Sequence, residues 1–149
     1  MSVLKLAYIS CTSEIFKEEK DIDDILEVAA KYNKENDITG ILLFKGGIFV
    51  QLLEGPEENV KKLYGKICAD LRHRNITLLV KQHDEERLFS DWSMGYRKVS
   101  DLDLQLVNDV LPWSEMVEKT HQGEKVDNEK IMEMLKLFSF HIKPEDRSA

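Results

Sequence analysis

The 149-residue sequence predicts an α+β fold, because segments with the alternation of strands are interleaved with two segments of helical periodicity. Five segments have the alternating or β-branched, apolar content of strands. They are residues 3–10, 38–45, 48–54, 76–82 and 92–99. Gly46-Gly47, between the second and third of these, is the signal of a two-residue hairpin. The resulting order, β-α-β-β-α-β-β, is that of a ferredoxin-like sandwich with one added strand, with a mostly antiparallel sheet and both helices on one face.

Alternation along the first strand divides its side chains between two faces. One face carries Leu4, Leu6, Tyr8 and Ser10, and the other carries Val3, Lys5, Ala7 and Ile9. On the third predicted strand, Phe49, Gln51 and Leu53 share a face. Tyr8 and Gln51 are therefore expected as polar groups among apolar neighbours.

The first helix should begin at Asp21, because Asp21 and Asp24 have the spacing of a capping box. An apolar stripe then recurs at helical spacing. Its members are Ile22, Ile25, Leu26, Ala29 and Ala30. The next position in the series is Asn33, so an amide stands where the stripe calls for an apolar residue.

Tyr8, Asn33 and Gln51 come from three different elements. A buried amide without a hydrogen bond costs about 1–3 kcal/mol, so each amide alone is most simply a satisfied core group. Together the three residues predict polar groups that converge in an apolar crevice, which suits an aromatic ligand with polar edges. These residues do not by themselves identify the ligand.

The second helix is expected to open at Gly55-Pro56, with proline in the first turn and acidic residues after it. Its stripe is Val60, Leu63, Tyr64, Ile67, Cys68 and Leu71. Cations at residues 72–74 should end it at the negative end of the helix dipole. Cys68 lies on the stripe, so we expect a thiol in the core.

Two helices are expected after the sheet, near residues 102–111 and 129–141, with a break at Pro112 and a polar linker over 119–130. The apolar arc of the second helix is wider than one packed face needs. It comprises Ile131, Met132, Met134, Leu135, Leu137, Phe138 and Phe140. This helix should cover the open face of the sheet or contact another chain. We therefore expect two units, residues 1–100 and a helical extension over 101–149.

Composition narrows the function classes. The net charge of −7 argues against nucleic acid as the main partner, because that affinity depends largely on cationic contacts. No apolar run is long enough to span a membrane, and the N-terminus does not resemble a signal peptide. With only two cysteines, the chain is expected in the cytoplasm. Neither a metal-ligand spacing nor a motif for nucleophilic catalysis is evident.

Five fragments of this sequence resemble, in order and spacing, the BLUF family of photoreceptor domains, whose name stands for blue-light-using flavin. They are AYIS with Tyr8 and Ser10, YNKENDITGILLF with Asn33, GIFVQLLEGPEE with Gln51, ICADLRH with Asp70 to His73, and RLFSDWSM with Trp92 and Met94. The resemblance covers about residues 3–100. It implies one flavin, usually FAD with FMN also possible, held non-covalently between the two helices.

The resemblance also implies roles for individual residues. Tyr8 matches the photochemical tyrosine and Gln51 the switching glutamine, with Ser10, Trp92 and Met94 beside them. Flavin contacts are implied for Ile25, Asn33, Phe49, Gln51, Lys66, Ile67, Asp70, Arg72 and His73. Two simpler explanations stay open, since Trp92 could be core packing, and Arg72 and Arg74 could be helix-end cations.

The function implied is that of a blue-light photoreceptor which signals to a partner protein through a Tyr/Gln hydrogen-bond switch. No catalytic output domain is expected, so the chain would not be an enzyme. We expect a homo-oligomer and a separate downstream regulator. Two alternatives remain at this point. One is a small enzyme on the same fold, either an acylphosphatase-like hydrolase or a flavin-dependent monooxygenase, and the other is an interaction module without flavin.

Overall fold

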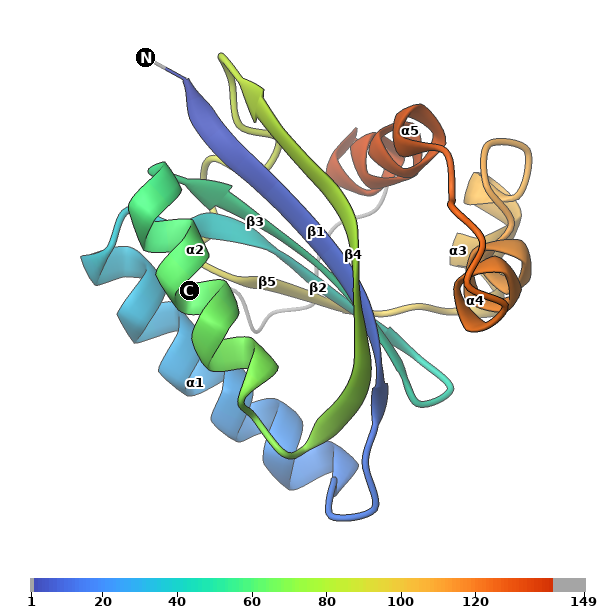
Figure 1. The fold of residues 1–149 in the computed structure, drawn as a ribbon, viewed down its shortest axis with the longest axis horizontal. Helices are drawn as coiled ribbons and strands as arrows, with labels where there is room; N and C mark the ends of the chain where they lie inside the picture. The colour runs from blue at the N-terminus through green and yellow to red at the C-terminus, as the bar shows by residue number, and fades with distance from the viewer. Residues whose placement is uncertain (1, 141–149) are drawn as a thin grey trace.

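Five strands form one mixed sheet in the order β4-β1-β3-β2-β5 in the computed structural model, which describes residues 2–140 (Figure 1). The strands are β1 (Val3–Thr12), β2 (Thr39–Lys45), β3 (Ile48–Gly55), β4 (His73–Asp84) and β5 (Gly95–Lys98). Neighbouring strands are antiparallel, except that β5, a short edge strand, runs parallel to β2. The predicted ferredoxin-like α+β fold, with its added strand, is confirmed.

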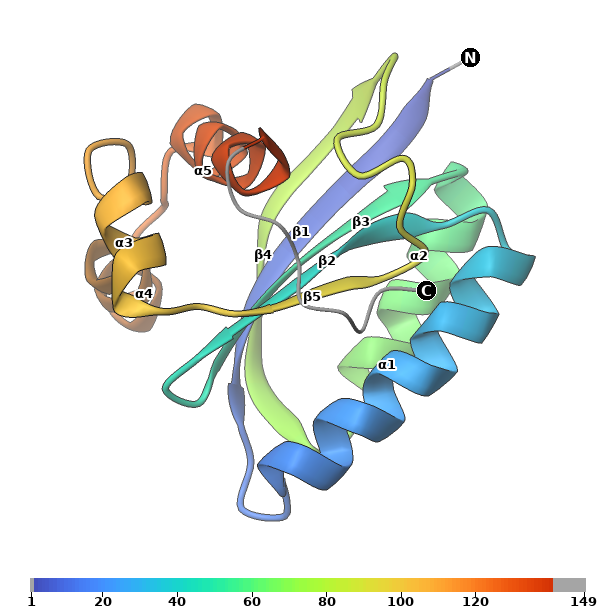
Figure 2. The same cartoon turned by 180° about the vertical axis from the view of Figure 1, so that it is seen from behind.

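Helices cover both faces of this sheet (Figures 1 and 2). Helices α1 (Glu18–Glu35) and α2 (Glu57–Cys68) lie on one face, as expected. Helices α3 (Asp101–Val107), α4 (Trp113–His121) and α5 (Asn128–Phe140) lie on the other. We call them the cap. Because side chains alternate along a strand, the sheet contributes to two hydrophobic cores, one on each face. On β1, Leu4, Leu6 and Tyr8 belong to the core under α1 and α2, and Ala7 and Ile9 belong to the core under the cap.

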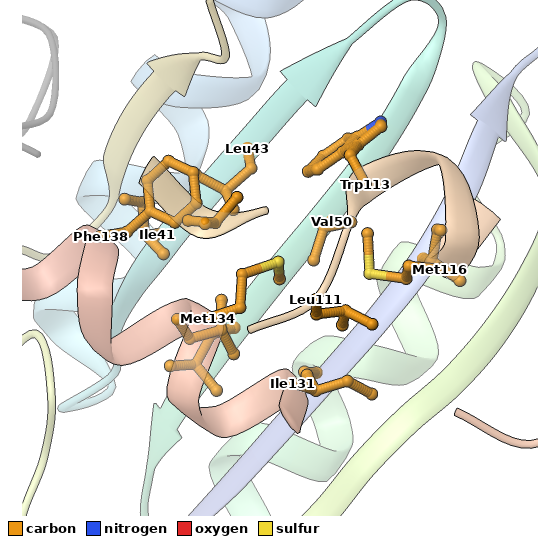
Figure 3. Packing of buried hydrophobic residues seen from close by; sticks show 14 of the residues in the cluster. Ile41, Leu43, Val50, Leu111, Trp113, Met116, Ile131, Met134 and Phe138 are labelled. Carbon is orange, nitrogen blue, oxygen red and sulfur yellow. The ribbon is translucent and has the colours of Figure 1, made fainter. Parts of the chain in front are cut away.

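The cap packs on the sheet through the stripe expected on the last helix. Ile131, Met134, Leu135 and Phe138 are fully buried, and Figure 3 shows Phe138 and Met134 near Ile41, Leu43 and Val50. Met132 and Leu137 are partly buried against the same core. The buried stripe of α5 thus lies against the face of the sheet that α1 and α2 leave open. The expected last residue of this helix, 141, lies outside the described residues.

Several predicted boundaries are wrong, each for a local reason. Helix α1 begins at Glu18, and Asp21 lies inside its first turn, where its carboxylate accepts the backbone N–H of Lys17 at 2.7 Å. The expected pair of C-terminal helices is three in the described residues, because α3 ends at Val107 rather than at Leu111 and α4 was missed. Pro112, expected to break a helix, is instead the N-cap of α4. The expected linker at 119–130 accordingly begins inside α4.

Helix α2 ends at Cys68, earlier than its stripe suggests. Asp70 accepts the backbone N–H of Arg72 at 2.9 Å and forms a turn, after which β4 begins at His73. Arg72 is therefore a loop residue rather than a helix-end cation, and Cys68 is exposed rather than a core thiol. Within residues 2–140, no helix combines the length and the apolar character needed to cross a membrane.

Candidate functional site

A cavity of about 260 Å³ lies between α1, α2 and the sheet. Small-molecule sites are commonly about 300–1,000 Å³, so this volume suits a planar ring system rather than a whole dinucleotide. All nine flavin contacts implied by the sequence line it. They are Ile25, Asn33, Phe49, Gln51, Lys66, Ile67, Asp70, Arg72 and His73. Tyr8 lines it as well, whereas Ser10, Trp92 and Met94 are not among its lining residues.

Tyr8 and Gln51 form a direct hydrogen bond in the wall of this cavity. They are register partners on β1 and β3, and the Tyr8 hydroxyl donates to Gln51 Oε1 at 2.5 Å. Both side chains are buried. Burial raises the pKa of Tyr8 well above its ordinary value, so the phenol keeps its proton and remains a donor.

The other end of the Gln51 amide contacts Met94. Gln51 Nε2 donates to Met94 Sδ at 3.4 Å, and Met94 is fully buried just before β5. Gln51 thus stands between a phenol that donates to it and a thioether that accepts from it.

Asn33 is buried near the end of α1, and its amide has one satisfied and one unsatisfied end. Its Nδ2 donates to the backbone carbonyl of Ser93 at 2.9 Å. Its Oδ1 is buried without a hydrogen-bond partner among the described residues. An unmet buried acceptor costs about 1–3 kcal/mol, so this atom points to a donor on a ligand. The imide N–H of a flavin ring is such a donor, so the residues present fit this group.

Ser10 acts on the cavity through His73. The His73 Nε2 lies 2.6 Å from the carbonyl oxygen of Ile67, which can only accept, so Nε2 carries a hydrogen. Nδ1 lies 2.8 Å from the Ser10 hydroxyl, which donates to it when the ring is neutral. The imidazole is therefore held between β1 and the end of α2.

Charged side chains gather at the α2 end of the cavity. Arg72 forms a two-pronged ion pair with Asp70, at 3.0 Å from Nε and 2.7 Å from Nη2, and these hydrogen bonds hold the pKa of Asp70 below its usual value. Lys66 Nζ lies 4.4 Å from the centre of the Tyr32 ring, a cation–π contact that joins α2 to α1.

Trp92 and Met94 do not share a face, contrary to the expected strand over 92–99. Met94 belongs to the core under α1 and α2, whereas Trp92 packs against the cap core with its ring 5.5 Å from that of Phe89. The reason is that β5 begins only at Gly95, so residues 92–94 do not alternate as a strand.

Two contributors escaped the sequence analysis. Ser93 acts through its backbone carbonyl, for which no side-chain signal exists. Glu54 is buried with Lys5 on the cap side of the sheet, where the two form an ion pair. The sequence could have predicted this pair, because each residue is a single charge, of opposite sign, on an otherwise apolar strand face. In the part of the chain that the structure describes, no group of three or more His, Cys, Asp or Glu side chains is placed to bind a metal.

Known proteins resemble this chain in sequence and in fold. A family model described as "BLUF: Sensors of blue-light using FAD" matches residues 3–95. The blue light- and temperature-regulated antirepressor BluF of Escherichia coli (strain K12) is 45% identical over 92 residues, which are 62% of this chain and 22% of that protein. The photoactivated adenylate cyclase subunit beta of Euglena gracilis is 39% identical over 75 residues, 50% of this chain and 9% of that one. The chain spans less than a quarter of either relative.

Solved structures match over a larger share of the chain. The structure "BlsA photo-activated state" has a TM-score of 0.78 and 30% identity, covering 97% of this chain and 99% of that one. The structure "BlrB - a BLUF protein, dark state structure" has a TM-score of 0.75 and 28% identity, covering 93% and 96%. These similarities extend beyond the sheet into the cap.

Proposed function

Because this chain belongs to the BLUF family of blue-light sensors, we propose that it is a blue-light photoreceptor which holds one flavin non-covalently in the cavity under α1 and α2. One observation carries the proposal: the Tyr8 hydroxyl donates to Gln51 in the wall of that cavity. The unmet Asn33 Oδ1 supports it, because it needs a donor such as the flavin edge. The signal is passed to a partner protein, and the chain itself catalyses no reaction.

A bound flavin would supply a chromophore for blue light whose excited state is an electron acceptor. Tyr8 supplies the electron, and its hydroxyl proton passes to Gln51 Oε1, to which it is already hydrogen-bonded. Electron and proton both return to Tyr8, so the cycle consumes nothing. The burial that raises the pKa of Tyr8 also keeps this proton from water.

The orientation of the Gln51 amide can distinguish the dark state from the light state, because the two ends of the amide are chemically different. In the structure, its oxygen accepts from Tyr8 and its nitrogen donates to Met94. Reversal of the amide would turn Nε2 toward the Tyr8 oxygen and Oε1 toward the Met94 sulfur. A thioether has no hydrogen to donate, so Met94 loses its contact and the change reaches β5.

We propose FAD as the flavin, with Lys66 and Arg72 near its phosphates. The family description and the cations at the end of the cavity support this choice. The test is to measure dissociation constants for FAD, FMN and riboflavin. Phosphate recognition predicts that riboflavin binds more weakly than FMN, and that Lys66→Met reduces the difference. Equal dissociation constants for all three flavins would show that the protein does not recognise the phosphate groups.

The output surface is proposed to be the helical extension, residues 101–149, which contacts a second copy of the chain or a separate regulator. The position of the cap supports this proposal, because only Val99 and Ser100, the N-cap of α3, separate it from β5. The acidic charge and the two free cysteines are compatible with a cytoplasmic location without nucleic acid or membrane as partner.

An absorption spectrum tests the function as a whole. The protein is reconstituted with FAD, freed of excess flavin and recorded before and after blue light. A red-shift of the flavin bands that reverts in the dark is expected. A protein that stays colourless supports a flavin-free module, and bleaching that oxygen restores supports a flavin-dependent enzyme. Either of these results would reject the photoreceptor.

A further inference from the structure

The connection from β4 to β5 crosses the whole end of the sheet, because these strands lie at opposite edges (Figure 2). We call residues 87–94 the crossover segment. Its hydrogen bonds reach Glu54 at the end of β3 and then Gly40 at the start of β2, before Met94 meets Gln51. Its course therefore decides how Met94 meets the amide of Gln51.

Glu54, at the end of β3, is hydrogen-bonded to the beginning of the crossover segment. Its carboxylate accepts the backbone N–H groups of Leu88 at 2.7 Å and Phe89 at 2.8 Å. It also accepts from Lys5, its register partner on β1. Glu54 and Lys5 are 0% and 1% exposed, so water does not substitute for any of these contacts.

The remainder of the crossover segment is tied by backbone groups and by Asn33. The backbone N–H of Gly40 donates to the Trp92 carbonyl at 3.1 Å, and Asn33 Nδ2 donates to the Ser93 carbonyl at 2.9 Å. Arg87, at its start, donates to the carbonyl of Asp37 at 2.9 Å. Glu54 is thus the one side chain that accepts from two consecutive backbone N–H groups of the segment in the described structure.

We propose that Glu54 is a positioning residue of the light switch: by fixing Leu88 and Phe89 it sets where Met94 lies against Gln51. This inference rests on the proposed function. Glu54 and Gln51 are three residues apart on β3 and point to opposite faces of the sheet, so one strand holds both the anchor and the switch. The glutamate carboxylate offers one acceptor oxygen to each of the two N–H donors, whereas a glutamine side chain of the same length has only one acceptor oxygen.

A competing account is that the Lys5–Glu54 pair merely stabilises the fold. Buried ion pairs are often no better than neutral replacements, although removal of one partner alone is strongly destabilising. Three variants separate the accounts: Glu54→Gln, Lys5→Met and the double variant. Lys5→Met leaves the Glu54 carboxylate in place as the acceptor for the N–H groups of Leu88 and Phe89. The double variant, which combines Glu54→Gln and Lys5→Met, has no buried charge at this site, but its amide offers these two N–H groups only one acceptor oxygen.

Two readouts go beyond stability. One is the rate of dark recovery after blue light. The other is the NMR shift of a ¹³C-labelled Met94 methyl in the dark, assigned with Met94→Leu, which requires no photochemistry. Loss of one buried hydrogen bond in the segment should change the recovery rate about five- to tenfold. Glu54→Gln and the double variant should both show this change in recovery rate, and both should shift the Met94 NMR signal by a similar amount. Lys5→Met should keep the wild-type recovery rate and Met94 signal, even if this variant unfolds at a lower temperature.

The double variant is decisive, because it leaves no unpaired buried charge and can be studied even if Glu54→Gln does not fold. A double variant with the wild-type recovery rate and Met94 signal would overturn the positioning role and leave only a stabilising pair. Failure of the proposed function is a different result, since then even the wild-type protein would show no reversible red-shift. The dark Met94 signal would still report on Glu54 in that case.

Discussion

Tyr8 and Gln51 are directly opposite each other on β1 and β3, and a 2.5 Å hydrogen bond joins their side chains across the strand pair. The register of the sheet alone brings them together, because directly opposed residues place their Cβ atoms about 4.5–5.5 Å apart. A slip of one residue would send Gln51 to the cap face. The same register that folds the sheet therefore also assembles the switch.

Tyr8→Phe should abolish the reversible red-shift while the protein stays folded and yellow. The substitution keeps the ring but removes the hydroxyl that donates to Gln51 Oε1. The buried oxygen left behind should lower the free energy of unfolding by about 1–3 kcal/mol. Spectra before and after blue light measure the first effect, and denaturant titration measures the second. Tyr64→Phe is the control, since the Tyr64 ring lies 5.8 Å from that of Tyr8 outside this hydrogen bond. A normal shift in Tyr8→Phe would contradict the assignment.

Gln51→Ala should likewise leave the flavin bound but without a red-shift, because the amide that changes its hydrogen bonds is gone. Its loss also leaves the Tyr8 hydroxyl buried without its acceptor. Spectra and flavin content are measured on the same sample. Gln82→Ala is the control, because this half-buried amide lies on the edge strand β4 and donates to Asp84 at 3.3 Å. The assignment fails if the variant holds flavin and shifts as the wild type does.

Asn33→Ala should weaken flavin binding about tenfold, the equivalent of one buried hydrogen bond of about 1.4 kcal/mol. The side chain offers its unmet Oδ1 to the ligand and holds Ser93 with Nδ2. Fluorescence titration with FAD provides the dissociation constant. Asn36→Ala is a matched control, because that amide caps the same helix by donating to the Tyr32 carbonyl at 2.8 Å. Equal affinity in the two variants would show that Asn33 does not contact the flavin.

Asp103→Asn should destabilise the protein at pH 7 but progressively less in acid. Burial raises the pKa of Asp103, but hydrogen bonds from Arg97 at 2.9 and 3.0 Å and from Ser100 outweigh it, so the pKa lies below its ordinary value. A lowered pKa stabilises the fold above the ordinary value of about 4 and loses its effect as the pH falls through the folded-state value. The expected loss at pH 7 is about 1.5–3 kcal/mol.

The measurement is denaturant unfolding of wild type and Asp103→Asn from pH 7 down to pH 3. The two curves of unfolding free energy against pH should converge on the acid side. Asp101→Asn serves as the control, because its carboxylate is in a surface pair with Lys45 at 3.3 Å and should change stability by less than about 1 kcal/mol. A constant gap across the range would show that the charge of Asp103 is not what holds α3 to β5.

Phe138→Ala should lower the free energy of unfolding by about 3–5 kcal/mol, because the ring is fully buried between α5 and the sheet. Leu102→Ala, at a site 75% exposed on α3, should stay within about 0.5 kcal/mol of wild type. Folded Phe138→Ala should keep the dark flavin spectrum, since the cavity lies across the sheet. A flavin lost from the folded variant would show that cap packing shapes the cavity.

Alternation and helical spacing were enough to assign the two faces of the sheet and to bring Tyr8, Asn33 and Gln51 to one crevice. These are local patterns, and the alternation of β1 and β3 persists in the folded chain. The side of Trp92 could not be predicted in the same way. Its position depends on the crossover segment, whose course is set by Glu54, more than thirty residues away in the sequence. Helix α4 escaped because Pro112 is compatible with both the end and the start of a helix.

The brevity of β5 has a consequence for how a partner could recognise the light state. Only four register pairs, from Ile41–Gly95 to Phe44–Lys98, cover the outer edge of β2. Local opening of so short a strand costs far less than global unfolding. If loss of the Met94 contact releases β5, a row of backbone N–H and C=O groups on β2 becomes available for pairing. Because β5 leads directly into α3 and its Arg97 pairs with Asp103, such an opening would also loosen the cap, the surface that we propose contacts the partner.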